Sequence, residues 1–150
     1  MILVKNKKAH YDYTITKTIQ AGIVLIGAEV KSLRNKSASL QGSYIKIIGK
    51  EAWLINARIN PYKYSSNENY DPRRTRKILL TKKQIFKLFE YVEYKNYSLV
   101  PLSIELVNNK IKVNIGIGKG KKEFEKRDKI KKRDLKRQMA KNFKQTKLKV

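Results

Sequence analysis

The chain has 150 residues, 41% of them hydrophobic, and its 36 lysines and arginines against 12 acidic residues give a formal net charge of +24. This length and hydrophobic content suit one folded domain with a single core and exclude a chain that is disordered throughout. There is no cysteine, one histidine and no apolar run near the ~20 residues of a membrane span, so we expect a cytoplasmic protein without disulfides, metal, cofactor or membrane segment.

The positive charge requires a polyanion, and nucleic acid is the first candidate. Genome composition and a membrane-surface role are the two alternatives. An AT-rich genome raises the lysine content for reasons unrelated to binding, but it does not explain why acidic residues are so few. A membrane-surface role would need a broad apolar face in the basic C-terminal segment, which that segment lacks.

Along the first part of the chain, Tyr11, Tyr13 and Ile15 alternate with polar residues, a period that predicts a half-buried strand. Ala21 and Gly22 interrupt that pattern. The apolar run over residues 23–26 then predicts a strand buried on both faces. A short helix over residues 29–34 follows, with inward side chains that we expect to be Val30 and Leu33.

Two hairpins are predicted from turn residues that separate apolar runs. Their turns are Gly49-Lys50 and Asn108-Asn109. The flanking strands cover residues 43–48 and 52–59 in the first hairpin, and residues 102–106 and 111–117 in the second. Pro101 lies early in its strand, which indicates a sheet edge or a bulge there because proline cannot donate to the ladder.

A longer helix is predicted to begin after Thr81, which forms a capping box with Gln84, and to end at Asn96. Its apolar face comprises Ile85, Leu88, Phe89 and Val92. About six strands with about three helices predict a mainly β fold with some α: a small antiparallel β-barrel related to the oligonucleotide-binding (OB) fold.

Residues 60–77 form a long segment without periodicity, in which tyrosines alternate with arginines and lysines. Such long loops are usually functional or disordered. Tyrosine rings stack on unpaired bases and guanidinium groups grip phosphates, so this composition favours an RNA site. The alternative is a mobile charged loop whose tyrosines pack on the body of the protein.

The C-terminal segment 119–150 is the most basic part of the chain, with fifteen lysines and arginines against four acidic residues. Gly116, Gly118 and Gly120 precede it without the spacing of a phosphate-binding loop, and we interpret them as a hinge. Leu135, Met139 and Phe143 form only a narrow apolar stripe, so we expect the segment to be flexible when free and to fold on binding RNA. No carboxylate pair or histidine motif indicates an enzyme.

Several segments together resemble the SmpB family, the SsrA-binding proteins of bacterial trans-translation. The resemblance runs nearly end to end and is carried by residues 6–13, 21–34, 43–44, 54–56, 60–62, 71–80, 99–102 and 119–122. It implies an OB-like barrel over residues 1–118 and a basic tail over residues 119–150 that becomes helical on the ribosome. It also implies binding to the tRNA-like domain of tmRNA and its delivery to stalled ribosomes, after which incomplete proteins are tagged for degradation.

The resemblance further implies partners and site residues. The partners are tmRNA, the decoding centre and mRNA channel of the small ribosomal subunit, and elongation factor Tu indirectly through charged tmRNA; the protein is expected to act as a monomer. The tmRNA contacts would be Lys7, Lys8, Tyr11, Glu29, Lys31, Ser32, Arg34, Asn56, Arg73, Arg74 and Arg76. The ribosome contacts would be Lys119, Lys121, Lys122, Phe124, Glu125, Lys126 and Arg127.

Two positions depart from the family pattern, since Glu125 stands where aspartate is more common and Phe124 where histidine or tyrosine is common. Phe124 can stack on a base but cannot donate a hydrogen bond. Two alternative functions stay open from the sequence. One is a ribosomal or ribosome-assembly RNA-binding protein, and the other is an RNA-processing enzyme that uses His10 or Glu29.

Overall fold

The computed structural model describes residues 1–66, 68–121 and 133–138, and the chain divides into two compact units, Met1–Gly120 and Lys121–Val150. In the second unit, residues 133–138 are helical. The elements of the first unit are, in chain order, β1 (Ile2–Lys5), α1 (Ala9–Asp12), β2 (Tyr13–Ile23), α2 (Gly27–Arg34), β3 (Ala38–Ser39), β4 (Tyr44–Ile48), β5 (Glu51–Ile55), β6 (Arg58–Ile59), β7 (Arg76–Leu79), α3 (Lys82–Lys95), β8 (Ser98–Val107) and β9 (Lys110–Gly120).

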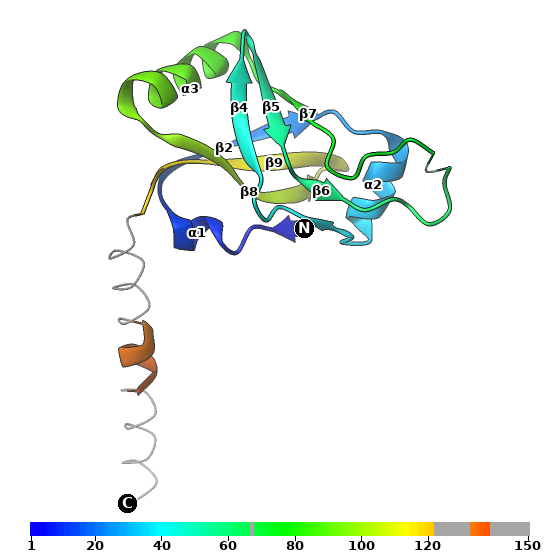
Figure 1. Ribbon diagram of the computed structural model, residues 1–150, viewed down its shortest axis with the longest axis horizontal. Coiled ribbons are helices and arrows are strands. Elements are labelled where there is room, and N and C mark those ends of the chain that lie inside the picture. The colour runs from blue at the N-terminus through cyan, green and yellow to red at the C-terminus, as the bar shows by residue number, and fades with distance from the viewer. Residues whose placement is uncertain (67, 122–132, 139–150) are drawn as a thin grey trace, which may run out of the picture. The chain divides into compact units, whose positions relative to one another are not determined.

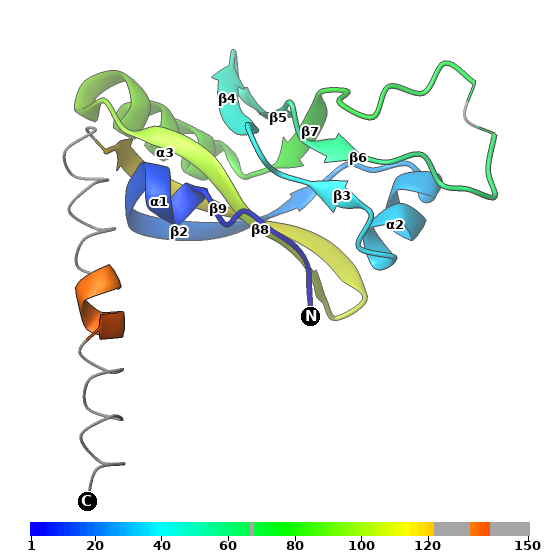
Figure 2. The same cartoon turned by 60° about the horizontal axis from the view of Figure 1, so that its bottom comes forward.

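The main sheet has seven strands in the order β1-β8-β4-β5-β7-β2-β9, and all of its pairings are antiparallel. An additional pairing of β8 with β9 closes the circuit from β8 through β4, β5, β7, β2 and β9 back to β8. β3 and β6 form a separate two-stranded sheet. In Figures 1 and 2, α3 and α2 lie at opposite ends of this arrangement. The predicted mainly antiparallel β class with a minority of helix is confirmed.

The core lies between the strands and is closed at the two ends by single helix residues. Ile104, Val113 and Ile115 from β8 and β9 are fully buried, and Leu33 of α2 and Leu88 of α3 join the same cluster. Burying a leucine of this kind contributes about 1.5–3 kcal/mol. No helix among the described residues is long and apolar enough to cross a bilayer.

The local turn and cap predictions are confirmed. Gly49 and both asparagines of the 108–109 turn have positive φ, which suits the tight turns that join β4 to β5 and β8 to β9. Thr81 and Gln84 form the predicted capping box, and α3 ends at Asn96 in the left-handed region. The register of β8 shifts between Pro101 and Ser103, so the bulge interpretation of the proline is also confirmed.

Four local predictions are wrong. Tyr11 lies in α1 and not in a strand, because the chain turns after β1 before β2 begins. β2 then continues through Ala21 and Gly22, and it ends at Ile23, so residues 23–26 are not a buried strand. Ile26 is 48% exposed and precedes α2, whose buried residues are Glu29, Ser32 and Leu33; Val30 is only half-buried.

The hinge interpretation is also wrong for Gly116 and Gly118, which lie inside β9, whereas Gly120 is the last residue of that strand. Gly118 is required by a close backbone approach: a Cβ atom there would lie 2.3 Å from the carbonyl oxygen of Thr14. The register of β2 against β9 shifts just beyond this point, between Ile15 and Lys17. The glycine therefore allows β2 to pass against β9 at its bulge.

Candidate nucleic-acid interface

The carboxylate of Glu29 in α2 lies at the centre of an ion-pair network with Arg74, from the loop that joins β6 to β7, and Arg76, the first residue of β7. Figure 1 shows where α2 and this loop lie in the fold. Oxygen Oε2 of Glu29 accepts from Nε of Arg76 at 2.6 Å, and the carboxylate oxygens also accept from Nε and Nη2 of Arg74. The hydroxyl of Tyr70 lies 3.0 Å from Oε2. Glu29 further accepts from the backbone amide of Ile26 and so caps α2.

The side chain of Arg76 is completely buried and every branch of its guanidinium is bound. Nη1 donates to the carbonyl oxygen of Ala57 at 2.8 Å, and Nη2 donates to that of Pro72 at 3.0 Å. These bonds fix the end of the loop against β6. Because a buried guanidinium needs a counter-charge, Glu29 and Arg76 form a structural unit with no surface left for RNA.

Burial and ion pairing shift the pKa of the Glu29 carboxyl group in opposite directions. Burial raises the pKa of its carboxyl group, but the bonds from Arg74, from the Ile26 amide and from Arg76 outweigh it, and the pKa lies below its ordinary value. For Tyr70, burial and then the charge of Glu29 raise the pKa of the phenol. Both effects keep the network in one charge state at neutral pH, with an ionised Glu29 and a neutral Tyr70.

This network corrects part of the predicted tmRNA site. Glu29, Ser32 and Arg76 are buried, so they cannot contact RNA from the folded protein. Arg74 is partly buried and paired with Glu29. Asn56 lies in the turn between β5 and β6 and not on a strand face; its Nδ2 donates to the carbonyl oxygen of Gly42.

Other predicted residues remain exposed around the same helix and loop. Lys31 and Arg34 lie one turn apart on α2, and Nζ of Lys31 is 5.4 Å from the ring centre of Tyr62. Figure 2 shows the loop extending outward beside α2. We define the α2–loop surface by its exposed side chains, which are Lys31, Arg34, Lys63, Tyr64 and Arg73.

The loop is partly ordered by its own aromatic residues. The rings of Tyr62 and Tyr64 meet edge to face with centres 5.6 Å apart, and Lys63 lies over the ring of Tyr64. Tyr64 is 78% exposed. The sequence left two interpretations of residues 60–77: an RNA site, or a loop whose tyrosines pack on the body of the protein. Tyr70 packs on the body, whereas Tyr64 leaves an aromatic face accessible to a base.

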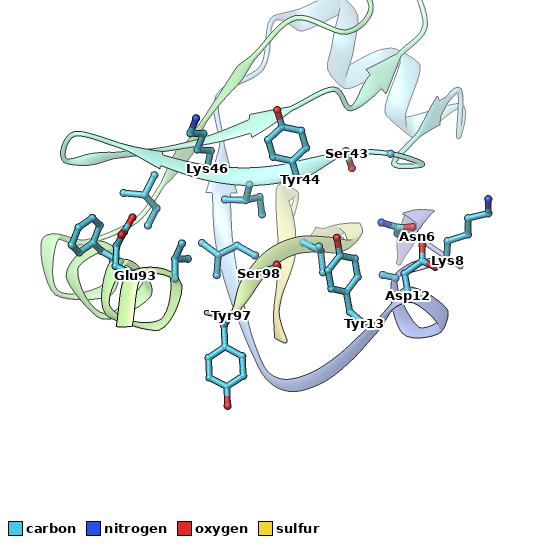
Figure 3. Close-up of a pocket in the computed structure, with 18 residues that line it drawn as sticks. Asn6, Lys8, Asp12, Tyr13, Ser43, Tyr44, Lys46, Glu93, Tyr97 and Ser98 are labelled. Carbon is cyan, nitrogen blue, oxygen red and sulfur yellow. The ribbon is translucent and has the colours of Figure 1, made fainter. Parts of the chain in front are cut away.

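Of the predicted residues near the N-terminus, Lys8 lines a cleft of about 460 Å³ between α1, β4 and the junction of α3 with β8. Lys8 and Tyr13 line it from one side, and Tyr44 and Lys46 from β4 on the other. Figure 3 shows Tyr13 pointing toward the strand that carries Tyr44, whereas Tyr97 points the opposite way. The cleft thus combines aromatic rings and exposed lysines, as a nucleotide-binding groove does, with two carboxylates, those of Asp12 and Glu93.

Lys7 and Lys8 are exposed and Tyr11 is half-buried, and all three follow β1. Sequence reasoning missed Tyr13 and Tyr44 because alternating tyrosines in strands are typical of core and surface positions alike. No pattern along the chain indicates that β2 and β4 face each other across a cleft.

The predicted ribosome contacts fall largely outside the described residues. Lys119 lies in β9 and not in a tail, with its Nζ 5.2 Å from the ring centre of Tyr97. Lys121 is half-buried. The remaining predicted contacts, Lys122, Phe124, Glu125, Lys126 and Arg127, lie outside the described residues.

Comparison with known proteins identifies the family of this chain. The model of the SmpB protein family matches residues 3–145. An SsrA-binding protein from Elusimicrobium minutum (strain Pei191) is 46% identical over 144 residues, which cover 96% of this chain and 92% of that protein. An SsrA-binding protein from Lysinibacillus sphaericus (strain C3-41) is 44% identical over 143 residues, with 95% and 92% covered.

A solved structure supports the same relationship. One chain of the structure described as "tmRNA-SmpB: a journey to the center of the bacterial ribosome" is 42% identical to this chain, with a TM-score of 0.66. The match covers 79% of this chain and 84% of that one. The family model, the relatives and the fold agree, and the chain belongs to the SmpB family.

Proposed function

We propose that this protein binds the tRNA-like domain of tmRNA and delivers it to stalled ribosomes, so that incomplete proteins are tagged for degradation. The observation that supports the proposal most is the near full-length similarity, at 44–46% identity, to proteins named SsrA-binding protein. The neighbouring solved structure, described as tmRNA-SmpB at the bacterial ribosome, supports the ribosome as a partner. A general ribosome-assembly role is not favoured by either observation.

The folded unit is proposed to hold the RNA through exposed cations and aromatic faces, and not through the buried Glu29 network. The α2–loop surface offers Lys31, Arg34 and Arg73 for phosphates and Tyr64 for an unpaired base. The cleft beside Lys8 is a second candidate within the same unit. Glu29 acts indirectly, because it holds the loop that carries Lys63, Tyr64 and Arg73.

The double variant Lys31→Gln/Arg34→Gln is expected to weaken binding to a tRNA-like domain transcript by roughly 6-fold to 40-fold near 0.1 M salt. The estimate follows from a salt exponent of ~0.8 for each phosphate contact that is lost. A filter-binding or fluorescence-anisotropy titration measures it. The matched control is Lys5→Gln/Lys110→Gln, which removes the same charge from exposed positions on β1 and β9. Equal losses in both double variants would reject the α2–loop surface as the site.

The chain beyond β9 is proposed to act on the ribosome, where its basic side chains reach the decoding centre and mRNA channel and bind ribosomal RNA. A protein ending at Lys121 retains every strand of the first unit. It is expected to bind the tRNA-like domain within about 3-fold of the full chain but to lose tagging of stalled nascent chains in a reconstituted translation system. Tagging at a normal level by the shortened protein would contradict the role of the C-terminal segment.

A further inference from the structure

Three lysines from three different elements gather over two neighbouring tyrosine rings. Nζ of Lys17 on β2 lies 2.5 Å from the hydroxyl oxygen of Tyr91 and 5.2 Å from its ring centre. Lys95, at the end of α3, lies 5.0 Å from the same ring. Lys119 on β9 lies 5.2 Å from the ring centre of Tyr97, and the two rings meet edge to face at 5.5 Å. We call these five residues the lysine–tyrosine cluster.

The positive charge of this cluster is not neutralised by the part of the chain that the structure describes. Ion pairs there join Glu29 to Arg74 and Arg76, and Glu51 to Lys77; none involves Lys17, Lys95 or Lys119. Ammonium groups gathered around the same rings repel one another, and an exposed cation–π contact stabilises the arrangement by only about 0.5–1 kcal/mol. The arrangement therefore leaves an unbalanced positive patch at the surface.

The negative end of α3 accounts for only part of this arrangement. Lys95 lies in the last turn of the helix, where a cation is favoured by about 0.3–1 kcal/mol. The carbonyl oxygen of Tyr91, however, already accepts from the amides of Asn96 and Tyr97. Lys17 and Lys119 come from β2 and β9, so their approach is not a property of the helix end.

The hydroxyl oxygen of Tyr91 accepts a hydrogen bond from the ammonium group of Lys17. The hydrogen bond between the two groups raises the pKa of the lysine, and the same bond lowers the pKa of the phenol. Lys87, one turn before Tyr91, joins Lys17 around a shallow depression of about 90 Å³. The patch thus presents several exposed ammonium groups with partly fixed positions, which reduces the entropy lost when an anion binds.

We propose that the lysine–tyrosine cluster is a binding site for the phosphate backbone of RNA. Lysines lie over Tyr91 and Tyr97, and both rings are half-buried, unlike the exposed ring of Tyr64, so these rings position cations and are not the platforms on which bases stack. Contact is with phosphates and is independent of base sequence. The proposal rests on the proposed RNA-binding function. It adds a site separate from the α2–loop surface, because α3 and α2 lie at opposite ends of the sheet (Figure 1).

The test compares the full-length protein with its Lys17→Gln/Lys95→Gln variant. The probes are a tRNA-like domain transcript and purified small ribosomal subunits, which distinguish the two RNA sources. In at least one arm, we expect affinity to fall roughly 6-fold to 40-fold near 0.1 M salt and the slope of log K against log salt to decrease by about 0.7–0.9 for each lost contact. Lys5→Gln/Lys110→Gln controls for net charge, and a thermal melt checks that each variant is folded.

Each outcome bears on a different claim. Wild-type protein that binds neither RNA would refute the proposed function itself. Wild-type binding with no greater loss in Lys17→Gln/Lys95→Gln than in the control, in both arms, would overturn the cluster proposal alone. Phosphatidylglycerol vesicles are a third probe. If Lys17→Gln/Lys95→Gln loses affinity for these anionic vesicles and for neither RNA, the result would also overturn the cluster proposal, in favour of a lipid surface. A loss that differs between two RNA duplexes of unrelated sequence would contradict backbone contact.

Discussion

Replacing Glu29 with glutamine is expected to lower the free energy of unfolding by about 3–5 kcal/mol, the range measured when one partner of a buried ion pair is removed. The reason is the fully buried guanidinium of Arg76, which keeps its hydrogen bonds to carbonyl groups but loses its counter-charge. Urea unfolding followed by the fluorescence of Trp53, the single tryptophan, measures the change. A loss below about 1 kcal/mol would contradict the structural role of this network.

The matched control is Glu51→Gln, which removes the exposed partner of Lys77. That pair is expected to contribute about 0–1 kcal/mol. Acid titration separates the two carboxylates further. Because the folded-state pKa of Glu29 lies below its ordinary value of 4.5, its contribution is complete above that pH and is lost as the pH falls through the folded-state pKa. The difference in unfolding free energy between wild type and Glu29→Gln should therefore become smaller as the pH is lowered.

Replacing Gly118 with alanine is expected to cost about 3 kcal/mol of unfolding free energy, near the upper end of the usual range for overpacking. The new Cβ atom would lie 2.3 Å from the carbonyl oxygen of Thr14, so the backbone of β2 or β9 must move. Gly120→Ala is the control from the same strand, since its Cβ atom would meet only the ring of Tyr13 at 3.9 Å. Thermal and urea unfolding should leave this control within about 0.5 kcal/mol of wild type.

The turn, cap and bulge predictions agree with the structure, whereas the local strand patterns through Tyr11 and over residues 23–26 do not. The turn at Gly49, the cap at Thr81 and the bulge at Pro101 each follow from a backbone preference that acts within a few residues. The family resemblance also indicated the fold class, because it compares many such positions at once.

The errors at Gly118 and at the predicted RNA site arise where a contact joins residues far apart in the chain. Gly118 resembles a hinge until Thr14 is placed against it, and Arg76 resembles an RNA ligand until Glu29 is found 47 positions earlier in the sequence. The neighbouring sequence does not indicate whether a cation in a basic run forms a buried ion pair or faces solvent. The lysine–tyrosine cluster was missed for the same reason, because β2, α3 and β9 meet there only in the folded chain.

The position of β9 determines how the folded unit bears load. This strand pairs with β2 along one edge and with β8 along the other, and the chain continues from its end into the basic C-terminal segment. Hydrogen bonds of antiparallel strands run perpendicular to the strand direction. A force applied along the strand through the C-terminal segment therefore loads both ladders in shear, so that many bonds resist together. β9 thus provides a mechanical anchor for the segment that follows it.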